Sequence, residues 1–151
     1  MEIWNLMSSA MLNFLAIIAD LYSPLLLILC LALCLYQWRK GLRFYAIRLL
    51  AIAVASYTAM FIDHWLNLWG HLGLDFSTHT ATSLGMVLFL AAWGSKKLGC
   101  ALLGSLLAYC WIMYVENYHS WADMVSTAVV MSAVFFAVFK LTDKLTRNSH
   151  R

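Results

Sequence analysis

Charged residues are scarce in this chain, and so are the residues that interrupt helices. Only 11% of its 151 residues are charged, and 64% are hydrophobic, whereas a soluble domain carries about 25% charged residues. One proline and seven glycines leave little sequence for linkers. The apolar residues run in long blocks without the alternation of a barrel strand. The composition therefore excludes an ordinary soluble domain and predicts one all-α integral membrane domain over residues 1–151.

Several segments are long and apolar enough to cross a bilayer, which takes roughly 20 residues of helix. They are 21–37, 44–62, 80–95, 98–114 and 122–139. Residues 3–19 are apolar but interrupted by polar side chains, so we expect residues 1–20 to form a weak first span or an interfacial helix. The only charged residue before Asp20 is the acidic Glu2, so no basic n-region marks a signal peptide. The expected fold is a bundle of five to six transmembrane helices, followed by a cytoplasmic tail at 140–151.

Lysine and arginine are absent from two stretches of the chain, 63–79 and 114–121. All ten basic residues fall in the 38–48 junction, the 95–97 turn or the C-terminal tail. Because basic loops stay on the cytoplasmic side, these three places are predicted to be cytoplasmic. The two cation-free stretches, together with a corner at 20–23, then face the periplasm or the exterior of a plasma (inner) membrane.

Histidines and acids gather in the cation-free stretches, which hold four of the five histidines. Ionisable side chains near membrane depth are costly and indicate function. In "YHSWADM", residues 118–124, His119 and Asp123 are four positions apart. That spacing predicts that both lie on one helix face, where the carboxylate holds the second nitrogen of the imidazole.

His79 lies in "DFSTHTATS", residues 75–83, at the start of a predicted span on the same side of the membrane. Two outward histidines, one with an acid partner, allow one ring to attack while the other protonates a leaving group. His64, His71 and His150 are equally well explained as polar residues at the membrane interface.

These motifs resemble those of the type 2 phosphatidic acid phosphatase superfamily, helical membrane enzymes that remove or transfer lipid phosphate. "FSTH" stands where that superfamily has P-S-G-H and keeps Ser77 and His79. "MYVENYHSWAD" stands where it has R-x5-H-x3-D and keeps His119 and Asp123. The resemblance implies that His119 attacks phosphorus, that Asp123 orients it and that His79 protonates the departing oxygen, with no cofactor required.

The cations that hold phosphate in that superfamily are missing here. Met113 stands in the place of the arginine, and the stretch before "FSTH" has no lysine or arginine. Three interpretations follow. In the first, an active phosphatase binds its substrate through other groups, namely the hydroxyls of Ser77, Thr78 and Thr80, backbone N–H groups at the helix start, or protonated histidine.

In the second interpretation, a metal-dependent hydrolase holds a divalent ion such as zinc or manganese, which supplies the missing charge. Its candidate ligands are Asp63, His64, His71, Asp75, His79 and His119. In the third, the chain keeps the fold and serves as a non-catalytic binding or assembly subunit. The expected partners are the bilayer and a membrane lipid, and not nucleic acid, because the side of the site has no basic surface. The sequence leaves open which lipid is used and whether the chain forms oligomers.

Overall fold

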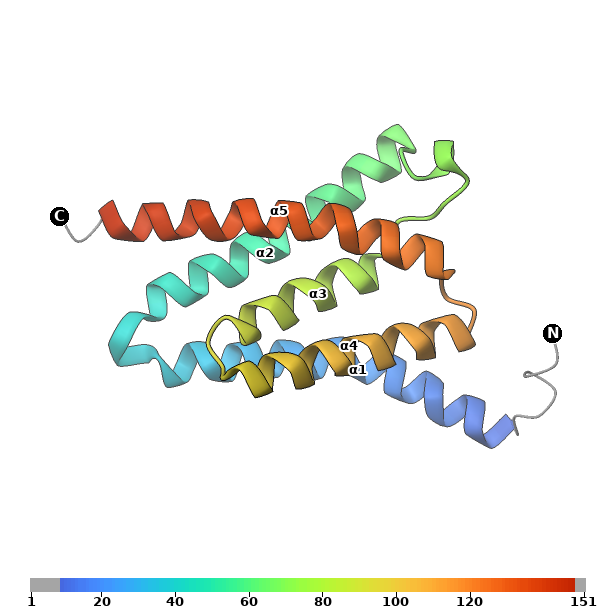
Figure 1. Cartoon of the computed structure of the whole chain (residues 1–151), viewed down its shortest axis with the longest axis horizontal. Coiled ribbons are helices and arrows are strands. Elements are labelled where there is room, and N and C mark those ends of the chain that lie inside the picture. The colour runs from blue at the N-terminus through green and yellow to red at the C-terminus, as the bar shows by residue number, and fades with distance from the viewer. Residues whose placement is uncertain (1–8, 149–151) are drawn as a thin grey trace.

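The computed structural model describes residues 9–148, and all regular structure within them is helical (Figure 1). The elements are α1 (Ser9–Tyr36), α2 (Trp38–Leu66), the short 3-10 helix η2 (Gly70–Leu72), α3 (Thr78–Ala91), α4 (Lys96–Val115) and α5 (Trp121–Asn148). The prediction of an all-α bundle is confirmed. Every α-helix except α3 is long and apolar enough to cross a membrane, as expected for an integral membrane protein.

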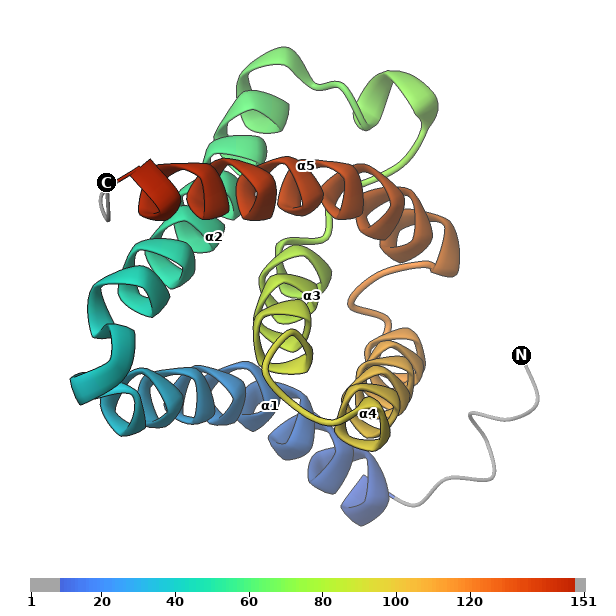
Figure 2. The same cartoon turned by 60° about the vertical axis from the view of Figure 1, so that its left-hand side comes forward.

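Helix α3 is the centre of the fold (Figure 2). It packs against each of the other four α-helices, which themselves form a ring: α1 beside α2, α2 beside α5, α5 beside α4, and α4 beside α1. With 14 residues, α3 is roughly 21 Å long and shorter than a hydrocarbon core of about 30 Å. Most of its residues are buried, so the ring shields it from lipid.

Three predicted spans lie within observed helices, 44–62 in α2, 98–114 in α4 and 122–139 in α5. The predicted span 80–95 is wrong as a full crossing, because α3 ends at Ala91 and lacks the necessary length. The predicted cytoplasmic tail at 140–151 is part of a helix as far as the structure describes it. Helix α5 continues without a break to Asn148.

The beginning of the chain also differs from the prediction. Residues 9–36 form one helix that includes Pro24, so the predicted span 21–37 is only its second half. The predicted corner at 20–23 lies in the middle of α1, and residues 9–19 are not a separate interfacial segment. Scattered polar side chains leave the backbone hydrogen bonds of a helix intact, which is why they do not end it. Residues 1–8 lie outside the described part of the chain.

The two ends of the bundle differ in charge. The loops at 67–77 and 116–120 lie at one end, which we call the site end (Figure 1). The α1–α2 junction, the α3–α4 turn and the C-terminal end of α5 lie at the other, which we call the basic end, because the lysines and arginines of the described residues fall in or near these segments. Arg48 joins α2 to α5 toward the basic end. It is buried, pairs with Asp143, and donates from Nε to Thr142 Oγ1 at 3.2 Å.

Close packing at Gly85 determines how near α3 approaches its neighbours. A Cβ atom at this position would lie 2.5 Å from Ile52 Cγ2 and 2.9 Å from Phe135 Cζ. Gly85→Ala is therefore expected to lower the free energy of unfolding by about 1–3 kcal/mol, as overpacking of a core does. Gly104→Ala is the matched control, because nothing lies within 4 Å of its Cβ position. Thermal melting in detergent measures both, and equal melting temperatures would contradict the packing.

Candidate functional site

The first turn of α3 carries His79 at the site end. Ser77 caps this helix, because its Oγ accepts a hydrogen bond from the Thr80 N–H at 3.2 Å. The N–H of Ser77 donates to Thr127 Oγ1 in α5 at 3.1 Å. These bonds fix the start of α3 against α5. His79 follows the cap by two positions, and its side chain is exposed.

The hydroxyls predicted to bind phosphate differ in their surroundings. Ser77 and Thr80 are 0% and 1% exposed, and their hydroxyl oxygens lie 2.9 Å from each other. Both therefore stabilise the start of α3 and do not face a ligand that arrives from outside. Thr78 is only half-buried, so it is the hydroxyl of the three that a ligand reaches most easily.

His119 comes from the loop between α4 and α5. Its side chain is 11% exposed, and its Nδ1 lies 3.5 Å from Asp75 Oδ2. This nitrogen is buried and has no hydrogen-bond partner. The prediction that His119 and Asp123 share a helix face is wrong, because α5 begins only at Trp121. The carboxylate beside the imidazole nitrogen belongs to Asp75.

Asp123 builds the beginning of α5. Its Oδ2 accepts from the backbone N–H and the hydroxyl of Ser120 at 2.8 and 2.7 Å, while the Asp123 N–H donates to Ser120 Oγ at 3.2 Å. This reciprocal arrangement is a capping box. The other oxygen, Oδ1, accepts from the Asp75 N–H at 2.8 Å. Asp123 therefore holds Asp75 and Ser120 in place. Asp75 lies beside the His119 ring and Ser120 follows His119 in the chain, so Asp123 positions the imidazole through these two residues.

The loop that carries Asp75 is fastened to α5 at a second point. Trp69 Nε1 donates to Ser126 Oγ at 2.9 Å, and the Trp69 N–H donates to Asp63 Oδ1 at 2.8 Å. The Trp69 ring packs edge-on against Phe76, with the ring centroids 5.0 Å apart. Asp75, next to Phe76, is thus held beside His119 even though 75% of its side chain is exposed. No local sequence pattern predicts this contact, because it joins two distant loops.

The rings of His79 and His119 lie close together at the site end. Their centroids are 6.3 Å apart, and the ring planes are inclined by 55°. The Tyr118 ring lies at the same centroid distance from His79. One imidazole is exposed and the other is largely buried, so a ligand that contacts His79 from outside also meets the edge of His119.

The environment of His119 favours the neutral form of its imidazole. Burial lowers the pKa of His119 below its usual value; Asp75 and Asp123 act in the opposite direction, and His79 lowers the pKa further. A neutral imidazole is the form that acts as a nucleophile or base. Since Nδ1 faces the Asp75 carboxylate, a proton is favoured on that nitrogen, and the lone pair of Nε2 is left for reaction.

The residues predicted as metal ligands do not form one cluster. Within residues 9–148, no three His, Cys, Asp or Glu side chains lie close enough to share an ion. The Asp63 carboxylate accepts the Trp69 N–H, while His64 and His71 are exposed near the end of α2 and in η2. The predicted set therefore does not provide the ligand shell that a zinc or manganese ion requires.

No cation of the sequence belongs to the segments that build the site. Lysine and arginine are absent between Arg48 and Lys96 and again between Lys97 and Lys140. Positive charge at the site is therefore available from protonated histidine. No family model, curated protein or solved structure matches the chain.

Proposed function

We propose that this chain is a membrane enzyme that hydrolyses or transfers a phosphate group on a membrane lipid, like the type 2 phosphatidic acid phosphatases that its motifs resemble. The observation that carries the proposal is the His79–His119 pair, with ring centroids 6.3 Å apart and Asp75 beside the buried ring. Two imidazoles supply the attacking nitrogen and the proton that cleavage of a phosphate ester needs. Both lie at one end of the bundle, where lipid head groups are found.

The proposed reaction has two steps. His119 Nε2 attacks phosphorus, and the bond from phosphorus to the alcohol oxygen breaks as His79 donates a proton to that oxygen. Water then attacks the phosphohistidine while the neutral His79 takes a proton from it, and the phosphorus–nitrogen bond breaks to release phosphate. Asp75 holds the Nδ1 proton, although the observed 3.5 Å must shorten when substrate binds, as catalytic contacts in free enzymes often do. Asp123 is a positioning residue.

We further propose that the site faces the periplasm or the exterior and that the C-terminus is cytoplasmic. The support is the collection of basic residues at the opposite end of the bundle. In a cysteine-free background, Gly73→Cys is expected to react with a membrane-impermeant maleimide in intact cells, and Ser95→Cys only after permeabilisation. The reverse pattern would contradict this orientation.

The pH dependence of phosphate release tests the proposed function. A phosphate monoester carries nearly two negative charges near neutral pH, and the site has no lysine or arginine to offset them. Protonated histidine provides that charge only near or below a pH of about 6.5, so activity is expected to be strongest at mildly acidic pH. Purified protein is assayed with a panel of lipid phosphates across pH, with and without chelator. Turnover that peaks above pH 8 would exclude charge compensation by protonated histidine, and turnover that is lost with chelator would contradict a mechanism that uses no metal.

Asp75→Asn gives a sharper form of this test. Because the Asp75 charge raises the pKa of His119, its removal is expected to move the acidic limb of the activity profile to lower pH. The displacement should be small, since Asp75 is mostly exposed and solvent screens its charge. Asp63→Asn is the control, and its acidic limb should coincide with that of the wild type. Ionisation of the substrate affects the wild type and both variants equally, so it cannot cause a difference between their profiles. An acidic limb at the same pH in Asp75→Asn and in the wild type would show that Asp75 does not act on the titrating group.

A further inference from the structure

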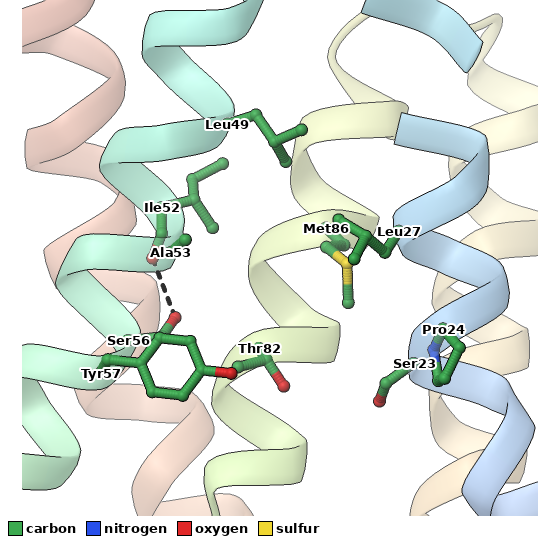
Figure 3. Close-up of a pocket in the computed structure, with 10 residues that line it drawn as sticks. All are labelled: Ser23, Pro24, Leu27, Leu49, Ile52, Ala53, Ser56, Tyr57, Thr82 and Met86. Atoms are coloured by element: carbon green, nitrogen blue, oxygen red, sulfur yellow. Dashed lines mark hydrogen bonds between the residues drawn. The ribbon is translucent and has the colours of Figure 1, made fainter. Parts of the chain in front are cut away.

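A groove opens between α1 and α2, with α3 as its floor (Figure 3). Its volume is about 360 Å³. Helices α1 and α2 are in contact, yet they diverge from their junction at the basic end (Figure 2). Both helices are long and apolar enough to span a membrane. The groove therefore opens sideways, toward the hydrocarbon of the bilayer.

The polarity of the groove changes along its length. Tyr57 and Thr82 line one end, and Leu49 and Met86 line the other (Figure 3). Thr82 follows His79 by one helical turn, and its hydroxyl lies 3.3 Å from the His79 carbonyl oxygen, to which it donates. The polar end thus points toward the two histidines and the apolar end points away from them. A lipid with its phosphate at the site has the same order of polar and apolar parts.

The serine and threonine hydroxyls in the groove wall already have partners inside the protein. Ser56 Oγ donates to the Ile52 carbonyl oxygen at 3.0 Å, and the hydroxyl oxygens of Ser23 and Ser83 lie 2.9 Å apart. Buried polar groups that lack partners would require water. Since the serine and threonine hydroxyls have partners, a hydrocarbon chain in the groove does not leave them unsatisfied, and the Tyr57 hydroxyl lies at the polar end.

We propose that this groove holds one acyl chain of the lipid whose phosphate lies between His79 and His119, an inference that rests on the proposed function. The bilayer supplies such chains directly at the open side of the groove. A helix from a second copy is a poorer fit, because a helix is about 10 Å across, and 360 Å³ would hold less than one turn of it. A single chain of methylene groups is much thinner and follows the groove from Thr82 to Leu49.

A substitution that fills the groove tests this assignment. Ala53 lines the groove, so Ala53→Phe places a ring in it. Val54→Phe is the matched control, because Val54 is 57% exposed on the same helix and does not line the groove. With dioleoyl phosphatidic acid, kcat/KM is expected to fall about tenfold or more in Ala53→Phe, which corresponds to lost burial of about two methylene groups. Val54→Phe should match the wild type, and turnover of glycerol 3-phosphate, which has no chain, should be equal in all three.

Native mass spectrometry of the same proteins with dioleoyl phosphatidic acid measures lipid binding separately from turnover. The wild type and Val54→Phe are expected to retain the lipid, and Ala53→Phe to lose it. If the lipid is bound in this pattern but no substrate releases phosphate, the result would support binding of an acyl chain in the groove and refute the proposed function. Equal turnover and equal retention in the two variants would overturn the groove assignment. A dimer lost only in Ala53→Phe would also overturn it, since the occupant would then be a second copy.

Thermal melting shows whether each variant is folded before either measurement is interpreted. Leu27→Trp fills the groove from the opposite wall, because Leu27 belongs to α1 and lines the same cavity. It is expected to reproduce the loss of long-chain turnover and of lipid retention. A folded Leu27→Trp protein with wild-type values for both would contradict the assignment, whatever the behaviour of Ala53→Phe.

Discussion

His119→Ala is expected to reduce phosphate release from a lipid phosphate by at least about 10³-fold, the scale of effect seen when a nucleophile or base is removed. In the proposed reaction, its Nε2 forms the bond to phosphorus, and within residues 9–148 His119 is the histidine whose ring nitrogen lies beside a carboxylate. The fold should survive, because the caps of α3 and α5 use Ser77, Ser120 and Asp123. Steady-state turnover and thermal melting in detergent measure the two expectations.

The control for this variant is His71→Ala. His71 is exposed in η2, and its removal changes the histidine count without touching the paired rings. It should retain wild-type turnover. Equal losses of turnover in His71→Ala and His119→Ala would show that the loss comes from removing any histidine and not from removing the nucleophile. Full turnover in a folded His119→Ala protein would exclude this residue as the nucleophile, and absence of turnover in the wild type with every substrate would favour the non-catalytic binding subunit.

His79→Ala is expected to have an effect that depends on the leaving group. With a lipid phosphate, the departing alcohol oxygen needs a proton, so turnover should fall by about 10²–10⁴-fold, the usual contribution of a general acid. With p-nitrophenyl phosphate, the phenolate departs without a proton, and the loss should be much smaller. The comparison of kcat/KM for the two substrates in wild type and variant measures the difference, because kcat/KM reports the attack on phosphorus and not the later hydrolysis of the phosphohistidine, which both substrates share.

His64→Ala provides the control for His79→Ala, because His64 is an exposed histidine in the last turn of α2. It should lose no activity with either substrate. An equal loss of kcat/KM with both substrates in His79→Ala would indicate that His79 binds or positions the phosphate group and does not supply the proton.

The bundle was predictable from the apolar blocks, but the place of α3 was not. A segment that is apolar on all sides suits lipid and a protein interior equally well, so 80–95 was predicted as a further span. The structure shows a shorter helix, Thr78–Ala91, surrounded by the other four. Residues 9–36 form one helix for a related reason. Their polar side chains lower hydropathy without breaking backbone hydrogen bonds, so hydropathy alone does not locate the end of a helix.

The candidate site was predictable in its histidines and not in its acids. Charge segregation placed His79 and His119 at one end of the bundle, and the structure brings their rings together. Asp123 was assigned to the imidazole from its spacing, although "SWAD" also matches the S-x-x-D pattern of a capping box. Asp123 instead accepts hydrogen bonds from the N–H and the hydroxyl of Ser120, because these donors are only three residues away in the chain. The contact of Asp75 with His119 depends on how two loops fold against α5, which no spacing reveals.

Trapping the covalent intermediate tests the central claim most directly. Purified protein is mixed with a lipid phosphate that carries a radiolabelled phosphate group, quenched with alkali during turnover, digested, and separated into peptides. An acid-labile, alkali-stable label is expected on the peptide that contains His119, and none in His119→Ala. A label on a peptide without His119, or steady turnover by a protein that never becomes labelled, would contradict it.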